Sequence, residues 1–304
     1  MTEGMILSRN LALILVGASG ICWASSGAAA QDFFNHSTKN VMELTNIRML
    51  GAGFLMLAIL FLQGNLKFSM ARMNRKPKLW LYLLIYGIVG IVMVQFTYFK
   101  AVSIGGVAAT TVILSATPAM VVIWDSLKNK KMPSRIETAA VILAILGVFL
   151  LVTGGDISKI VVPLSCVFWS LTSGASFAFS MIFGKVLFAE KINPAFMTTF
   201  GMLIGGLITL LMTDNFELTP FFEREVILNV AWIVIFGTAI AFFIFNAGLK
   251  YLTPEESALT ELTEPVAAVV ISYFAFGATF DLIEYFGMIL VLMAVVSPIV
   301  MKKF

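Results

Sequence analysis

Long runs of apolar residues alternate along the chain with short polar segments, and this pattern predicts helices that cross a membrane. A bilayer core about 30 Å thick takes roughly 20 residues of helix to cross. Runs of that length lie at ten places, at residues 10–30, 43–62, 79–98, 103–123, 136–153, 160–183, 195–212, 228–248, 256–276 and 283–301. They are continuously apolar and lack the alternation of a barrel strand, so an all-α integral membrane protein is predicted. The division between the third and fourth runs is the least sharply marked.

The first apolar run has features of a secretory signal peptide, because Arg9 precedes it and Ala28-Ala29-Ala30 could form a cleavage site. The run from Leu11 to Ala30 is nevertheless long enough to span a bilayer. We therefore interpret it as a retained first helix.

The composition agrees with a membrane protein and excludes a water-soluble one. Of the 304 residues, 60% are hydrophobic and 12% are charged, whereas a soluble domain carries roughly 25% charged residues. A chain this apolar could not cover a water-facing surface without large sticky patches. The single histidine and the two scattered cysteines, Cys22 and Cys166, cannot form a usual zinc site, so neither a metal nor a cofactor is predicted.

The basic residues are distributed unevenly between the two sides of the predicted bundle. If the N-terminus is cytoplasmic, that side holds 15 of the 20 Lys and Arg residues, the outer side holds 4, and Arg48 lies within a helix. Short cytoplasmic loops are enriched in Lys and Arg, so both termini are predicted to be cytoplasmic. The basic stretch from Lys67 to Lys78 is better explained by this topology and by anionic lipid than by nucleic acid.

A displacement of 147 residues superimposes several features of the first half of the chain on the second. The matched pairs are Gly90 with Gly237, Phe96 with Phe243, Pro118 with Pro265, and the dipeptides at 136–137 and 142–143 with those at 283–284 and 289–290; a displacement of 146 brings Trp23 onto Trp169. We predict two repeats of five helices, in residues 1–155 and 156–304. An odd number of helices turns the second copy upside down in the membrane, and inverted repeats are a transporter architecture.

Each half also carries a similar series of short motifs. They are Trp23-Ala24-Ser25, Arg48, Gly87, Gly90 and Ala116-Thr117-Pro118 in the first half, and Trp169-Ser170, Gly237, Leu252-Thr253-Pro254 and Thr263-Glu264-Pro265 in the second. This series resembles the EamA family of the drug/metabolite transporter superfamily, and the resemblance covers nearly the whole chain. It implies ten helices in two inverted repeats around a central cavity, from which amino acids or other metabolites are exported.

The chain departs from the family pattern at two places. Trp124-Asp125 stands at the end of the fourth predicted helix, where many members have a Gly-Glu pair. The seventh predicted helix carries Thr198-Thr199 in place of a counterpart of Arg48, which suggests that Arg48 serves only one half.

Glu261 and Glu264 form the acidic pair of the ninth predicted helix. If that helix starts near Glu256, Glu264 lies roughly 12 Å deep at about 1.5 Å per residue, with Glu261 one turn before it on the same face. A charged carboxylate at that depth costs at least about 2.5–3.5 kcal/mol, so it should face a cavity, form a pair or take up a proton. These residues therefore bind a substrate ammonium group or a coupling proton, or else serve as structural carboxylates.

Pro118 and Pro265 are predicted to break their helices at matching positions, which is a pointer to a transport site. Each lacks an N–H group, so the Glu261 carbonyl loses its normal helical partner at Pro265.

Five further side chains are candidates for contact with a substrate, although each also has a structural interpretation. Trp23 and Trp169 lie within helices, where they either line a cavity or pack in the bundle. Arg48 could bind a carboxylate, pair with a buried acid or extend to the headgroups. Tyr98, with Asn246 as a further candidate at the eighth helix, could also line the cavity.

Gly201 and Gly205 indicate close helix packing, within the fold or between subunits.

A secondary transporter of a small metabolite is the predicted function, and amino acids are the favoured substrates. Export of lipophilic cations is the alternative within transport, because an acid pair beside aromatic rings would suit a cation. A membrane enzyme acting on lipid is disfavoured, since the sequence has no Asp-rich pair or Ser/His/Asp set. The sequence also has no nucleotide-binding loop, so ATP is not predicted as the direct energy source, and protons are a candidate coupling partner. The sequence does not predict an oligomeric state.

Overall fold

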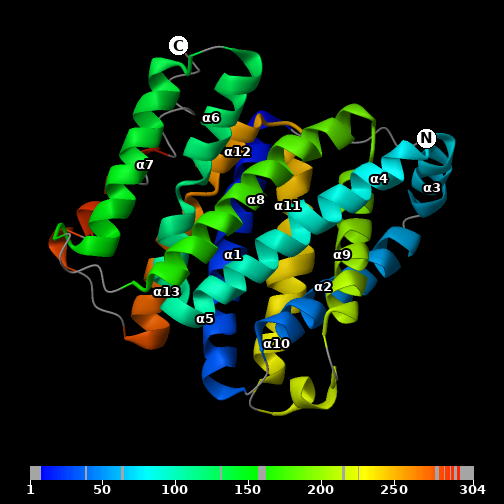
Figure 1. Ribbon diagram of the computed structural model, residues 1–304, viewed down its shortest axis with the longest axis horizontal. Helices are drawn as coiled ribbons and strands as arrows, with labels where there is room; N and C mark the ends of the chain where they lie inside the picture. The colour runs from blue at the N-terminus through cyan, green and yellow to red at the C-terminus, as the bar shows by residue number, and fades with distance from the viewer. Residues whose placement is uncertain are drawn as a thin grey trace.

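The computed structural model describes residues 8–37, 40–62, 65–130, 132–156, 162–213, 216–224, 226–277, 281–283, 285–287, 289–290 and 293–294. These residues form helices and no strand, as the sequence predicts (Figure 1). The tenth predicted run, 283–301, falls mostly outside the described residues. The helices are α1 (Arg9–His36), α2 (Val41–Leu62), α3 (Asn65–Arg75), α4 (Lys78–Ile85), η1 (Tyr86–Val92), α5 (Met93–Leu114), α6 (Thr117–Asn129), α7 (Arg135–Thr153), α8 (Leu164–Ala189), α9 (Pro194–Leu211), η3 (Thr219–Phe222), α10 (Ile227–Val234), η4 (Ile235–Ile240), α11 (Ala241–Leu249), α12 (Pro254–Thr260) and α13 (Thr263–Phe276).

Seven helical stretches among the described residues are long and apolar enough to cross a membrane. One of them, Lys78–Leu114, joins the third and fourth predicted runs. The two runs are nevertheless separate helices that meet at a kink. The division lies at Gly106, where φ is 75°, a few residues after the predicted one between residues 98 and 103. Glycine has no Cβ, so this left-handed conformation costs it little.

The outward faces of these helices carry large apolar side chains. Leu228 is 78% exposed, Phe274 is 81% exposed and Phe61 is 68% exposed. In water, exposed apolar surface on this scale would drive association. It suits lipid, where the helices satisfy their own backbone groups and present apolar side chains outward.

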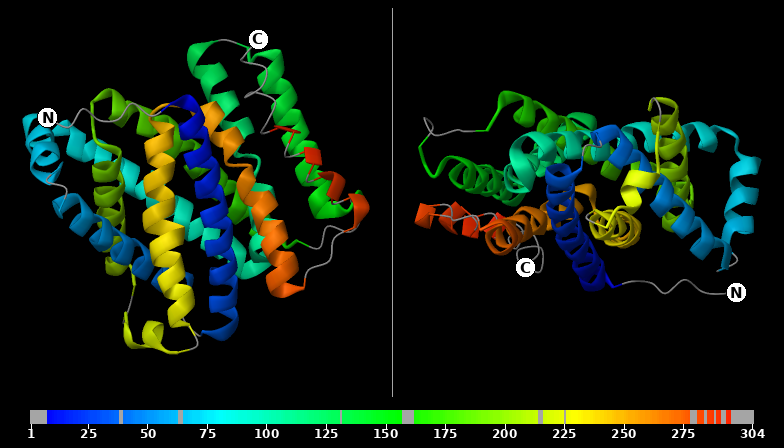
Figure 2. Two further views of the ribbon diagram at one scale, coloured as in Figure 1. Left: turned by 180° about the vertical axis from the view of Figure 1, so that it is seen from behind. Right: turned by 90° about the horizontal axis from the view of Figure 1, so that it is seen from below.

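α1 runs through the middle of the bundle and packs against helices from the second half of the chain. It lies between α11 and α13, as Figure 2 shows from behind, and it also contacts α10 and α12. α8 packs in turn against α5, η1 and α6 from the first half, and α2 packs against α9. The first helix of each half is thus embedded in the other half.

Close helix approaches in this bundle depend on glycine. A Cβ at Gly201 would lie 3.2 Å from Cδ1 of Tyr86, and a Cβ at Gly205 would collide with Met49. The Gly-x-x-x-Gly step therefore provides packing within the fold, against η1 and α2. Gly237 lies against Ser26 of α1 so closely that a Cβ there would overlap the serine side chain.

The amphipathic helix α3 is attached to the end of α8 by polar contacts. Arg72 Nε donates to the Glu190 carbonyl at 2.6 Å, and Lys76 Nζ donates to Glu190 Oε2 at 2.6 Å. This hydrogen bond with Lys76 holds the pKa of the Glu190 carboxyl below its usual value. The ion pair is therefore formed at neutral pH and is lost as pH falls through the lowered pKa.

We predict that Gly237→Ala lowers the stability of the fold by about 1–3 kcal/mol, because the added methyl group overlaps Ser26 in a packed interface. Gly184→Ala is the matched control, since its Cβ would lie 3.5 Å from Leu249 Cδ2 in ordinary contact. Thermal unfolding of the purified variants in detergent measures both effects. Equal unfolding temperatures for Gly237→Ala and the wild type would show that α1 does not approach η4 this closely.

Candidate functional site

Two spanning helices are interrupted at matching points. In the first half, α5 ends at Leu114 and α6 begins at Thr117, with Pro118 at its start. The Leu114 carbonyl accepts a hydrogen bond from Thr117 Oγ1 at 2.6 Å. The Thr117 hydroxyl thus takes the place of the N–H that Pro118 lacks.

In the second half, α12 ends at Thr260 and α13 begins at Thr263, with Pro265 at its start. The Glu261 carbonyl lacks the partner that residue 265 would normally provide, and it accepts a hydrogen bond from the Glu264 backbone N–H instead, at 2.8 Å. The chain tightens to a three-residue turn at this point and so satisfies the carbonyl.

A central cavity lies beside these breaks, where side chains from α1, α2, α5, α8, α11 and α13 meet. Its lining residues are Trp23, Ser26, Arg48, Val94, Gln95, Tyr98, Leu114, Ser173, Phe177, Phe242 and Glu264. The structure thus brings together Trp23, Arg48, Tyr98 and Glu264 of the residues predicted from the sequence. The free volume is about 30 Å³, and a water molecule needs roughly 10–15 Å³ of such volume. In this conformation the cavity is contracted around its polar groups.

Arg48 is 2% exposed, so its guanidinium lies inside the bundle and not at the headgroups. Its Nε donates to Thr238 Oγ1 at 2.9 Å, and its Nη2 donates to the Gly237 carbonyl at 3.1 Å. The guanidinium carbon also lies 4.3 Å from the centre of the Phe99 ring. These contacts to η4 and α5 fix the charge at the cavity wall.

Several polar atoms in the cavity wall have no hydrogen-bond partner among the described residues. They are Trp23 Nε1, Ser26 Oγ and both amide atoms of Gln95. A buried polar group without a partner costs about 1–3 kcal/mol. Groups of this kind gathered around one cavity, beside a guanidinium and a carboxyl, form a surface able to hydrogen-bond a polar molecule.

Glu261 faces a second cavity, which we call the acidic cavity. Its lining residues are Thr111, Leu114, Ser115, Thr117, Pro118, Phe177, Ala258, Glu261, Leu262, Glu264 and Pro265, and its free volume is about 20 Å³. Glu261 Oε1 lies 2.6 Å from Ser19 Oγ of α1, whereas Glu261 Oε2 has no partner among the described residues. Glu264 lines both cavities and therefore separates them.

Aromatic rings surround one side of the central cavity. The Trp23 ring centre lies 5.3 Å from that of Phe177, 4.9 Å from that of Phe242 and 5.3 Å from that of Phe245. Edge-to-face arrangements of this kind favour a fixed ring position.

Trp169 and Asn246 lie outside the lining of the central cavity. The Trp169 ring is half-buried and packs 6.0 Å from the ring of Phe96. Asn246 is buried, donates to Thr198 Oγ1 at 2.9 Å and accepts from Tyr86 OH at 3.4 Å. Their positions favour a structural role.

Sequence reasoning missed Gln95, Ser26, Ser173 and Thr238, all of which lie at or behind the cavity wall. Gln95 had a usable signal, since an amide in the middle of an apolar run needs a polar partner. The two serines had none, because serine is common on buried helix faces where it bonds to its own backbone.

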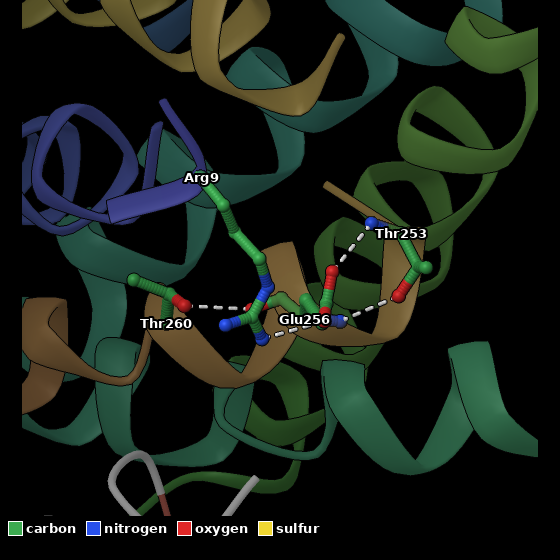
Figure 3. Close-up of polar contacts among 4 residues, drawn as sticks. All are labelled: Arg9, Thr253, Glu256 and Thr260. Carbon is green, nitrogen blue, oxygen red and sulfur yellow. Dashed lines mark hydrogen bonds and ion pairs between the residues drawn. The ribbon is translucent and has the colours of Figure 1, made fainter. Parts of the chain in front are cut away.

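A capping box and an ion pair stabilise the start of α12 (Figure 3). Thr253 and Glu256 form a capping box, in which Glu256 N donates to Thr253 Oγ1 at 3.1 Å and Thr253 N donates to Glu256 Oε2 at 3.0 Å. Glu256 Oε1 also accepts from Arg9 Nη2 of α1 at 2.9 Å. Arg9 therefore ties the beginning of α1 to the half-helix that leads into Glu261.

The chain is similar to known membrane proteins over nearly its whole length. The model of the family described as "EamA-like transporter family" matches residues 10–153 and again residues 164–297, so the resemblance noted from the motifs is confirmed. An uncharacterized inner membrane transporter, YicL of Salmonella typhimurium, is 27% identical over 298 residues, covering 95% of both chains. An uncharacterized transporter, YyaM of Bacillus subtilis, is 24% identical over 254 residues, covering 81% of this chain and 80% of that one.

The fold also has a counterpart among solved structures. A protein chain in a crystal structure superimposes with a TM-score of 0.76 and 15% sequence identity, covering 97% of this chain and 99% of the other. At this identity the likeness shows a shared fold.

We predict that Thr238→Val lowers stability by roughly 1.5–3 kcal/mol, because it removes the oxygen that accepts from the buried Arg48 Nε. Thr172→Val is the control, because the exposed Thr172 hydroxyl bonds only to Phe168 O of its own helix among the described residues. Unfolding temperatures in detergent measure both changes. Equal, small effects for the two variants would mean that Arg48 is not held at η4.

Proposed function

The chain belongs to the EamA-like transporter family, and we propose that it is a secondary transporter that exports amino acids or related small solutes. The observation that carries this proposal is that Arg48 and Glu264 line the same buried cavity. A guanidinium is suited to a substrate carboxylate, and a carboxyl group is suited to a substrate ammonium group. An amino acid carries both groups, and Trp23 and the Phe rings offer surface for its side chain.

Lipophilic cations remain the second class of substrate, since Glu264 stands beside aromatic rings. Arg48 argues against them, because its fixed positive charge in the same cavity would repel a cation that lacks an acid group. The zwitterion is therefore the substrate class that we favour.

We further propose that the chain forms ten membrane helices in two inverted repeats that move by alternating access. The family model matches twice, once in each half. The two halves also have a π-helix at corresponding positions. Adding the repeat offset of 147 residues to η1 (Tyr86–Val92) gives residues 233–239, which overlap η4 (Ile235–Ile240). The contacts of α1 with the second half are mirrored by those of α8 with the first. If the halves are related by a two-fold axis, the first helix of each half should make equivalent contacts with the other half, as α1 and α8 do.

The contracted central cavity fits one stage of such a cycle. With about 30 Å³ of free volume it cannot hold an amino acid, so substrate entry requires helices to separate around it. The breaks before Pro118 and Pro265 place flexible points next to the cavity. Motion at these points would open the site toward one side of the membrane at a time.

The proposed location is the cytoplasmic membrane, with both termini inside. The unequal distribution of Lys and Arg supports it.

We predict that green fluorescent protein fused to the C-terminus fluoresces, whereas alkaline phosphatase fused there is inactive, because the first reporter works inside the cell and the second works outside. The loop between α9 and α10 is the control position and should give the opposite pair of results. Active phosphatase at the C-terminus would contradict the orientation.

We predict that Glu264→Gln reduces amino-acid efflux by more than tenfold, because the variant loses the carboxylate that pairs with the substrate ammonium group. The test uses purified protein in liposomes loaded with labelled amino acids, with and without a pH gradient. It also tests our hypothesis that protonation of Glu264 is linked to turnover.

Glu223→Gln, on the exposed segment after η3, is the control and should transport as the wild type does. Full transport by Glu264→Gln with an unchanged pH profile would rule out a role for Glu264 in substrate or proton binding. Efflux of ethidium-like compounds without any amino-acid efflux would favour the lipophilic-cation alternative.

A further inference from the structure

A hollow with a free volume of about 340 Å³ lies between α3, the turn that joins α8 to α9, and the end of α11. We call it the basic pocket, because Arg72, Lys191 and Lys250 line it and none of its described lining residues is acidic. These three residues are far apart in the chain, so the fold brings them to one place. The volume is within the range of small-ligand sites, and a concave surface of one charge sign attracts ions of the opposite sign. The basic pocket is therefore suited to an anion.

Neighbouring acids do not neutralise the three basic side chains. Glu190 precedes Lys191 in the chain, but its carboxylate accepts from Lys76 Nζ at 2.6 Å. The Glu190 carbonyl accepts from Arg72 Nε at 2.6 Å, which fixes the guanidinium at the pocket wall. Lys191 and Lys250 are exposed and form no ion pair with a described residue. The pocket thus keeps its positive charge.

The neutral polar groups of the basic pocket can donate hydrogen bonds as well. Ser69 is only 6% exposed, and its hydroxyl has no hydrogen-bond partner among the described residues. Asn193 Oδ1 accepts from Ala195 N at 2.8 Å at the start of α9, so its NH₂ group is what remains to bind a ligand. The first turn of α9 adds the positive end of a helix dipole. Donors and positive charge of this kind match the oxygen atoms of a phosphate group.

α3 places this pocket at the membrane surface. Leu66, Met70 and Met73 of α3 pack against the core of the bundle, whereas Phe68 lines the pocket and is 76% exposed. An amphipathic helix with basic residues and an exposed aromatic ring is typical of the boundary between headgroups and acyl chains. α3 stands at the end of the bundle where α4 begins (Figure 1), which is the end that carries most of the Lys and Arg residues. Lipid headgroups are therefore within reach of the pocket.

We propose that the basic pocket binds the phosphate group of an anionic phospholipid through Arg72, Lys191 and Lys250. A zwitterionic lipid also carries a phosphate, but its ammonium group would meet three positive charges. Free phosphate shares the chemistry of the headgroup, and the exposed Phe68 beside the pocket favours a lipid, whose acyl chains the ring can contact.

A bound headgroup would join the two halves of the chain, because α3 belongs to the first half and Lys191 and Lys250 belong to the second. It would thereby hold α3 against the α8–α9 turn, in addition to the contacts of Arg72 and Lys76 with Glu190. The site rests on the location of the chain in a membrane and not on the transport of any amino acid.

Binding can be measured without a transported substrate. The full-length protein is purified in a neutral detergent, and its thermal unfolding is followed as phosphatidylglycerol or phosphatidylcholine with the same acyl chains is added. The unfolding temperature should rise and saturate with phosphatidylglycerol, because the lipid binds the folded state. Phosphatidylcholine should have a much smaller effect. Native mass spectrometry of the same samples should show phosphatidylglycerol retained on the protein.

Lys191→Gln combined with Lys250→Gln should raise the phosphatidylglycerol concentration at half-saturation by roughly tenfold, because two of the three pocket charges are lost. Both side chains are exposed, so the double variant should fold. Lys67→Gln combined with Arg75→Gln is the matched control. It removes two charges from exposed positions of α3 outside the pocket and should respond as the wild type does.

An equal loss of response in the two double variants would show only a diffuse attraction of lipid to the basic surface and would overturn the proposal. Equal stabilisation of the wild type by the two lipids would also contradict it. Inorganic phosphate, added without lipid at constant ionic strength, should leave the unfolding temperature unchanged. A saturating rise with inorganic phosphate, lost in the pocket variant, would assign the pocket to free phosphate in place of lipid. None of these results depends on amino-acid efflux, so failure of the lipid site and failure of the transport function are separable.

Discussion

The cost of placing charge in a membrane organises the interior of this protein. Arg48, Glu261 and Glu264 are each almost completely buried, in a bundle whose outer faces are apolar. Such groups are stable only where other polar atoms surround them. The polar atoms come from the interrupted helices, from the π-helices and from serines and threonines of the long helices. The need to accommodate these charges thus accounts for the shape of the bundle core.

The same constraint links structure to function. A bundle built only for stability would replace Arg48 and the two acids with apolar side chains, which pack as well and need no partners. Here the charges are present, and unpartnered polar atoms of Trp23 and Gln95 lie in the same cavity wall. The structure therefore holds unsatisfied bonding capacity at its centre, and a polar solute that enters the cavity can use it. The transport that we propose would use a site that is complete only when it is occupied.

Much of the fold could be read from the sequence, because apolar run length and the positions of proline and glycine act locally. The helices α2 and α9 begin and end close to the predicted bounds of 43–62 and 195–212. The exact place of the kink within Lys78–Leu114 was less predictable: it lies at Gly106, a few residues after the predicted division, because a turn-forming pair does not fix where the helix before it ends. The π-helices η1 and η4 were not predicted from the sequence.

The site was only partly predictable, for a related reason. Ionisable residues inside apolar runs stand out, so Arg48, Glu261 and Glu264 were identified. Which neutral side chains join them depends on the packing of distant helices, and the two tryptophans matched by the repeat end in different surroundings. Trp23 lines the cavity, whereas Trp169 packs against Phe96.

The most direct test of the account asks whether the central cavity opens to both sides of the membrane. Ser26, in the cavity wall, is changed to cysteine in a chain whose Cys22 and Cys166 are replaced by serine and alanine. Labelling by a membrane-impermeant thiol reagent is then followed from each side of oriented vesicles, with and without amino acid. The account predicts labelling from both sides, with protection by a transported amino acid. A cysteine at this position that reacts from neither side, or from one side under every condition, would contradict it.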